Sequence, residues 1–124
     1  MNIVSSSNAP AAIGPYSQAI VHNGVVYCSG QIGLTPSGEW AGDDVQSQVL
    51  QVLDNLDAVL RAAGSAPNLV IRATIFLESM DDFAVVNAAY GDFFGAHRPA
   101  RVCVEARRLP KDAKVEISCI AAIA

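Results

Sequence analysis

Apolar residues recur at helical spacing between positions 43 and 63, where they form one stripe along the segment. Asp43 can cap the start of a helix here, with Gln46 three residues further on, and Gly64 stands where the helix is expected to end. The pattern therefore predicts an amphipathic helix that buries one face. The stripe consists of Val45, Val49, Val52, Leu53, Leu56, Leu60 and Ala63.

A second helix is predicted from about Met80 to Phe94. Ser79 precedes it as the expected N-cap, and Gly95 follows it as the expected end. Its apolar residues again fall on one face, which both helices can turn toward the same core. That face carries Phe83, Val86, Tyr90 and Phe93.

The remaining apolar segments alternate as strands do. Ala19–His22 and Val25–Ser29 flank Asn23-Gly24, a strong signal for a two-residue hairpin turn. Segments Arg101–Arg107 and Lys114–Ile123 flank Leu109-Pro110-Lys111-Asp112, which predicts a second, C-terminal hairpin.

A central strand is expected over Asn68–Glu78, and both of its alternating faces are largely apolar. The order hairpin, helix, strand, helix, hairpin predicts an α+β sandwich, with two helices on one face of a largely antiparallel mixed sheet. The second face of the sheet then needs another subunit to cover it.

Composition narrows the picture further. The 124 residues fit one domain spanning 1–124, and a hydrophobic fraction of 52% against 16% charged residues favours self-association. A net charge of −4 argues against a general nucleic-acid binder, so nucleic acid is an unexpected partner. No apolar run approaches the roughly 20 residues that span a bilayer, and the N-terminus has no signal-peptide pattern, so no membrane association is expected.

The three cysteines, Cys28, Cys103 and Cys119, are odd in number and widely spaced, as in reduced cysteines of a cytoplasmic protein. The chain has no Cys-x-x-Cys pair, and His22 and His97 are each six residues from the nearest cysteine with no second ligand beside them in sequence, so no metal site is predicted. Motifs for dinucleotides, for nucleoside triphosphates and for a serine nucleophile are absent, which removes those enzyme classes.

The candidate reactive side chains are concentrated in the predicted C-terminal hairpin. Alternation places Arg101 and Cys103 on one face of its first strand and Glu116 on a face of its second. An arginine can bind a carboxylate through two hydrogen bonds, and a nearby glutamate can hold or deprotonate a water. From spacing alone, charged residues on the solvent-exposed face of a hairpin are a more common explanation of this pattern than a functional site.

Five stretches in order resemble the RidA family, also called YjgF, of reactive-intermediate deaminases, and they span nearly the whole chain. They are Ile13-Gly14-Pro15-Tyr16-Ser17-Gln18-Ala19, Ser29-Gly30-Gln31-Ile32, Val86-Asn87-Ala88-Ala89-Tyr90, Pro99-Ala100-Arg101 and Arg108-Leu109-Pro110-Lys111-Asp112, the last continuing into Val115-Glu116-Ile117.

The resemblance implies a chorismate-mutase-like fold, assembled as a homotrimer around a central barrel with ligand clefts between subunits. It implies hydrolysis of 2-enamino and 2-imino acids, such as 2-aminoacrylate and 2-aminocrotonate, to 2-keto acids and ammonia, without metal or organic cofactor. Arg101 then matches the arginine that pairs with the substrate carboxylate, and Glu116 the glutamate that positions water. Cleft-lining positions match Tyr16, Gly30, Asn87 and Cys103.

Two positions depart from the family pattern. Arg98 stands where many relatives have an aromatic residue, after a short loop, which bears on the size of the substrate. Ser118 stands where many carry a second acidic residue. Three other functions remain open: a small-molecule sensor that binds 2-keto acids or amino acids without turnover, an RNA-directed activity, and deamination of a different unsaturated amino acid.

Overall fold

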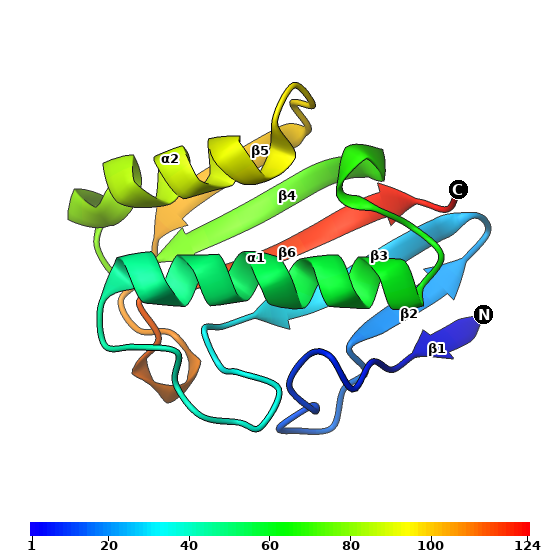
Figure 1. The fold of residues 1–124 in the computed structure, drawn as a ribbon, viewed down its shortest axis with the longest axis horizontal. Coiled ribbons are helices and arrows are strands. Elements are labelled where there is room, and N and C mark those ends of the chain that lie inside the picture. The colour runs from blue at the N-terminus through cyan, green and yellow to red at the C-terminus, as the bar shows by residue number, and fades with distance from the viewer.

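A six-stranded mixed sheet is covered on one face by two helices, which lie side by side across it (Figure 1). The computed structural model describes residues 1–124. The strands run in the order β1-β2-β3-β6-β4-β5, and only β4 and β5 are parallel. The α+β architecture, the largely antiparallel mixed sheet and the placement of both helices on one face are therefore confirmed. No helix in the structure is both long enough and apolar enough to span a membrane.

The elements follow the predicted order, with one additional short strand at the N-terminus. The strands are β1 (Asn2–Val4), β2 (Ala19–His22), β3 (Val25–Gln31), β4 (Val70–Leu77), β5 (Ala100–Glu105) and β6 (Val115–Ala122). The helices are α1 (Val45–Ala62) and α2 (Phe83–Phe94), with short 3-10 turns at Pro67–Leu69, Met80–Asp82 and Pro110–Asp112.

The predicted C-terminal hairpin is wrong. Strands β5 and β6 both pair with β4, which lies between them, so they are not neighbours. The chain does reverse direction between β5 and β6, as the turn residues indicated. The connection between β5 and β6 runs past the end of β4. Leu109 and Ala113 of this connection are buried against Ile32 and Leu34, so it is not the exposed tip of a hairpin.

The helix starts differ slightly from expectation. Asp44, not Asp43, caps α1, and its Oδ2 accepts a hydrogen bond from the Ser47 amide at 2.9 Å. Ser79 caps the 3-10 turn that precedes α2 and accepts from the Asp81 amide at 3.1 Å. The chain thus enters α2 through a tighter turn, and Phe83 is the first residue of the α-helix proper.

Alternation along the central strands separates a buried face from an open one. The residues under the helices are buried, among them Ala73, Ile75 and Leu77 of β4 and Val115, Ile117 and Cys119 of β6. The opposite face is also largely apolar, and much of it is uncovered: Ile3, Tyr27 and Val104 are exposed and Ile120 is half-buried. Phe76, on the same face, packs against the small cluster of Ile32, Leu34, Leu109 and Ala113. An uncovered apolar sheet face of this kind is typical of a surface that packs against another chain.

Buried amides of α1 hold the loop that follows β3. Asn55 is fully buried, and its Nδ2 donates to the carbonyls of Ile32 and Leu34 at 3.2 and 2.8 Å. A Cβ at Gly33 would lie 2.8 Å from the Gln48 Cα, so the loop runs directly against the helix backbone. These contacts fix the end of β3, which carries Gly30.

Replacing Asn55 by alanine removes two hydrogen bonds to buried carbonyls. We expect Asn55→Ala to lower the free energy of unfolding by about 2–3 kcal/mol, since each acceptor loses a partner that water cannot replace. Urea unfolding at one fixed protein concentration measures the change. Asp54→Ala, at the exposed neighbouring position of α1, is the matched control and is expected to stay within about 0.5 kcal/mol of the parent. Equal losses of unfolding free energy in both variants would contradict the proposed role of Asn55 in holding the loop after β3.

Candidate functional site

Arg101 projects from β5 toward α2, on the face of the sheet that the helices cover. Its Nη1 donates to the Asn87 Oδ1 at 2.8 Å, and its guanidinium carbon stands 4.9 Å from the centre of the Tyr90 ring. The Phe83 ring lies further away, at 5.8 Å. The two rings and the Asn87 amide hold the guanidinium in place, while Arg101 remains exposed.

No carboxylate of the chain neutralises Arg101. The three ion pairs of the structure are Arg61–Asp57, Arg108–Asp112 and Lys114–Glu78. Arg101 instead lines a pocket of about 300 Å³, whose other walls are Asn87, Tyr90, Gly91, Arg98 and Pro99. A positive charge held by neutral groups at a pocket wall is suited to bind an anionic ligand.

Cys103 lies two residues along β5 on the same face as Arg101 and is half-buried. Burial raises the pKa of its thiol, and the charge of Arg101 opposes that shift in part. The thiol therefore stays protonated near neutral pH, which does not suit a nucleophile. Cys103 is not among the residues that line the pocket of Arg101 described above.

Glu116 occupies the open face of β6, next to an irregularity in β3. Cys28 pairs with Cys119 and Gln31 pairs with Ile117, so β3 spans three residue steps where β6 spans two. This β-bulge places Gly30 beneath the glutamate. A Cβ at Gly30 would lie 2.5 Å from the Glu116 Oε1, so only glycine leaves the carboxylate its present position.

Burial raises the pKa of the Glu116 carboxyl, and no hydrogen bond or charge of the chain offsets the shift. The group lines a pocket of about 320 Å³ with Tyr16, Gly30, Ser29, Ile13, Ile32 and Pro110. Tyr16 reaches this pocket from a tight turn, in which its hydroxyl accepts a hydrogen bond from the Ile13 amide at 3.3 Å. A carboxylate with a raised pKa is suited to take a proton from water.

The structure thus divides the six predicted residues into two groups. Asn87, Arg101 and Cys103 form one, and Tyr16, Gly30 and Glu116 form the other. Arg101 is in register with Ala73 and Glu116 with Phe76, three residues apart along β4 and on opposite faces of the sheet. Strand spacing and rise put the Cα atoms of Arg101 and Glu116 on the order of 14 Å apart. A molecule of a few heavy atoms cannot touch both groups of one chain.

Tyr90 and Phe83 lie beside Arg101, although the sequence assigned neither of them to the site. Tyr90 lies three residues after Asn87, so both fall on the side of α2 that meets β5. The Tyr90 hydroxyl is buried without a hydrogen-bond partner in the chain, and burial raises its pKa.

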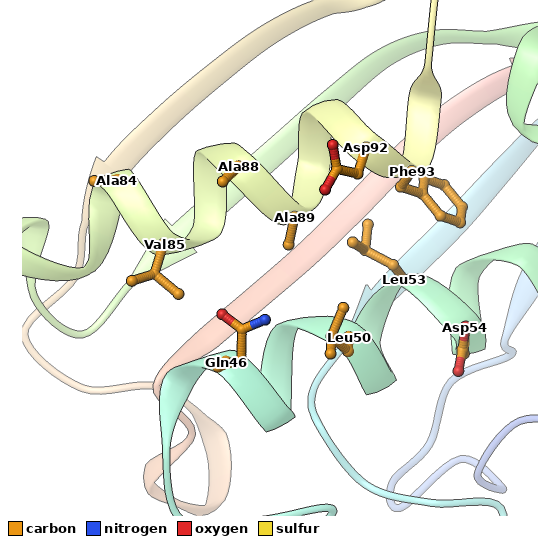
Figure 2. Close-up of a pocket in the computed structure, with 10 residues that line it drawn as sticks. All are labelled: Gln46, Leu50, Leu53, Asp54, Ala84, Val85, Ala88, Ala89, Asp92 and Phe93. Atoms are coloured by element: carbon orange, nitrogen blue, oxygen red, sulfur yellow. The ribbon is translucent and has the colours of Figure 1, made fainter.

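A larger groove lies between the two helices, with a volume of about 760 Å³ (Figure 2). Leu50 and Leu53 of α1 and Val85 and Ala89 of α2 project into it. Its charged residues, Asp54 and Asp92, are acidic and would repel a carboxylate ligand. It contains none of the predicted site residues. Elsewhere, no group of three or more His, Cys, Asp or Glu side chains is arranged to hold a metal ion.

Comparison with known proteins matches the chain over nearly its full length. The sequence model of the family described as Endoribonuclease L-PSP covers residues 6–123. A RutC family protein of Synechocystis is 49% identical, over 99% of this chain and 97% of that protein. The 2-iminobutanoate/2-iminopropanoate deaminase of Salmonella typhimurium is 45% identical, over 95% of this chain and 94% of that enzyme.

The fold has solved counterparts as well. The crystal structure described as a putative endoribonuclease L-PSP from Entamoeba histolytica superposes with a TM-score of 0.97. It is 49% identical, with 98% of each chain covered.

The raised pKa of Glu116 predicts a pH dependence of stability. The folded chain holds this proton to higher pH than the unfolded chain, whose pKa is near 4.5. Wild type should therefore lose stability relative to Glu116→Gln as pH rises through about 4.5 to the raised pKa, and the difference should then level off. Urea unfolding of both proteins across this range, at one protein concentration, measures it.

Asp44→Asn supplies a control of opposite sign. Hydrogen bonds from Ser47 lower the pKa of Asp44, so wild type should lose stability relative to this variant as pH falls below about 3.8. A difference for Glu116→Gln that is flat, or that runs in the same direction as the Asp44 difference, would show that the glutamate is not desolvated.

Proposed function

The chain belongs to the YjgF/RidA family, and we propose that it hydrolyses 2-imino and 2-enamino acids to 2-keto acids and ammonia. The observation that carries the proposal is the guanidinium of Arg101, which lies at a pocket wall without a carboxylate partner. Deaminases at 45% identity support the reaction type. Short substrates such as 2-aminoacrylate and 2-aminocrotonate give the imines of a three- and a four-carbon acid.

In the proposed mechanism Arg101 binds the substrate carboxylate through two hydrogen bonds, as arginine binds carboxylates elsewhere. An enamine first takes a proton at C3 and becomes the imine. Water, held by Glu116, adds to C2 and gives up a proton to the glutamate. The glutamate passes this proton to the nitrogen, which gives a carbinolamine. The hydroxyl of the carbinolamine then gives up its proton to the nitrogen as the C2–N bond breaks, so that nitrogen leaves as ammonia and the water oxygen becomes the keto oxygen. Because an imine is already electrophilic, orientation and one positioned water supply most of what the reaction needs.

Because one chain holds Arg101 and Glu116 on opposite faces, we propose that each site combines Arg101, Asn87 and Cys103 of one copy with Tyr16, Gly30 and Glu116 of another. The apolar open face of the sheet supports such an assembly. A homotrimer, with open faces turned toward a central barrel and sites at the three boundaries, satisfies both requirements. Three unbridged cysteines fit a cytoplasmic location.

Two other functions are outcomes of the first experiment. A sensor would bind the same carboxylates through Arg101 without releasing ammonia. The family description names an endoribonuclease, but a net charge of −4 disfavours RNA binding by this chain.

Arg101→Ala should abolish turnover while leaving the fold intact. Loss of a charged hydrogen-bonded contact of about 3 kcal/mol corresponds to a fall of at least about 100-fold in kcat/KM. A serine or threonine dehydratase supplies the imine, and the rate of keto acid formation is measured with and without the protein. Arg61→Ala, at an exposed arginine of α1, is the matched control and should retain full activity.

The outcomes separate the functions. Acceleration by wild type that disappears only in Arg101→Ala supports the deaminase. No acceleration, with carboxylate binding that depends on Arg101, would instead identify a sensor. Turnover by Arg101→Ala at the parent rate would remove Arg101 from the mechanism.

Mixing two inactive variants tests whether sites are shared between copies. Arg101→Ala and Glu116→Gln are each expected to be inactive or very slow as pure proteins. In mixed assemblies, a boundary is intact when Arg101 comes from the Glu116→Gln chain and Glu116 from the Arg101→Ala chain. In a trimer that contains both variants, one of the three boundaries is intact whichever variant is in the majority, so about a third of parent activity should return in the mixed assemblies.

The two variants are co-expressed with different tags, and doubly tagged assemblies are assayed. An equal mixture that has not exchanged subunits is the control. If doubly tagged assemblies have no more activity than the pure variants, the site does not draw Arg101 and Glu116 from different copies.

A further inference from the structure

Two arginines line one small pocket, and neither is neutralised. Arg98 and Arg101 both contribute to the pocket of about 300 Å³ beside the end of α2, whose other lining residues are Asn87, Tyr90, Gly91 and Pro99. No ion pair of the chain involves either arginine. A ligand that enters this pocket therefore meets two positive charges within a chain that is acidic as a whole.

Both guanidiniums are anchored and retain free donors. The Arg98 Nη1 donates to the backbone carbonyls of Gly95 and His97, which holds the side chain against the end of α2. The Arg101 Nη1 donates to Asn87. A guanidinium carries five N–H groups, so Nε and Nη2 of each arginine remain available to a ligand. Each arginine can bind one carboxylate.

Gly91 keeps the pocket wide. It lies inside α2, where glycine costs about 0.5–1 kcal/mol of stability relative to alanine. A Cβ at this position would meet no atom of the chain within 4 Å, so packing within the chain does not require glycine. The missing side chain leaves room in the wall of the pocket that holds the two arginines.

We propose that the pocket selects a dicarboxylic substrate: an imino acid whose C1 carboxylate binds Arg101 and whose side-chain carboxylate binds Arg98. This inference rests on the proposed function and narrows its substrate class. The chemistry is unchanged, since water adds to C2, ammonia leaves and a 2-keto dicarboxylate forms. A monocarboxylate neutralises one guanidinium, whereas a dicarboxylate neutralises both.

The test compares imines that differ by one carboxylate. Amino-acid oxidases, with dioxygen as oxidant, release the dicarboxylic imine from glutamate and a monocarboxylic imine from alanine, and their hydrolysis is timed with and without the protein. We expect wild type to prefer the dicarboxylic imine. Arg98→Gln should lower the ratio of the two kcat/KM values about tenfold, the size of one charged contact at an exposed site. Arg98→Lys should restore part of the ratio, and Arg61→Gln should leave it unchanged.

Calorimetry with 2-oxoglutarate and pyruvate gives a readout without turnover. Tighter binding of 2-oxoglutarate that is lost in Arg98→Gln, and weakened in Gly91→Ala by the narrower pocket, supports the inference. If the monocarboxylic imine is hydrolysed but Arg98→Gln changes both substrates equally, the dicarboxylate inference is wrong and the deaminase stands. If neither imine is hydrolysed but 2-oxoglutarate binding depends on Arg98, the proposed deaminase function is wrong and the assignment of a dicarboxylate-binding pocket is supported.

Discussion

The hydrogen bonding of β6 on both of its edges is the constraint on which the rest of the structure depends. Its alternation puts Val115, Ile117 and Cys119 beneath the helices and Glu116 on the open face. Since β3 and β4 both fix its register, a shift by one residue would break two ladders and move Ile117 into solvent. The same bonds that build the core therefore keep the Glu116 carboxylate and Arg101 on opposite faces of one chain.

Local signals in the sequence predicted most of the fold. The two apolar stripes identified α1 and α2, and Asn23-Gly24 identified the hairpin of β2 and β3, because helix faces and tight turns are encoded by residues close in sequence. The partner of β5 was not predictable in this way. A turn at Pro110 indicates that the chain reverses, but it does not say whether another strand lies between the two arms. That choice depends on β4, which is remote in sequence and apolar on both faces.

The site was predictable only in part. The motifs that resemble the family supplied the six candidate residues, and strand alternation correctly put Arg101 and Cys103 on one face of β5. The sequence pattern did not show which neighbouring residues hold these side chains in position. Tyr90 looked like an ordinary core residue until α2 was placed over β5, and the role of Gly30 depends on a bulge that appears only when β3 and β6 are paired.

The opposite facing of Arg101 and Glu116 has a consequence for how the protein responds to dilution. On the composite site proposed above, a separated chain carries every reactive group and yet has no working site. Activity per chain then falls as the protein is diluted below the concentration at which it assembles. A substrate that contacts two copies binds only the assembled form, so by mass action it lowers that concentration. Rising levels of the reactive acid would themselves favour the assembly that removes it.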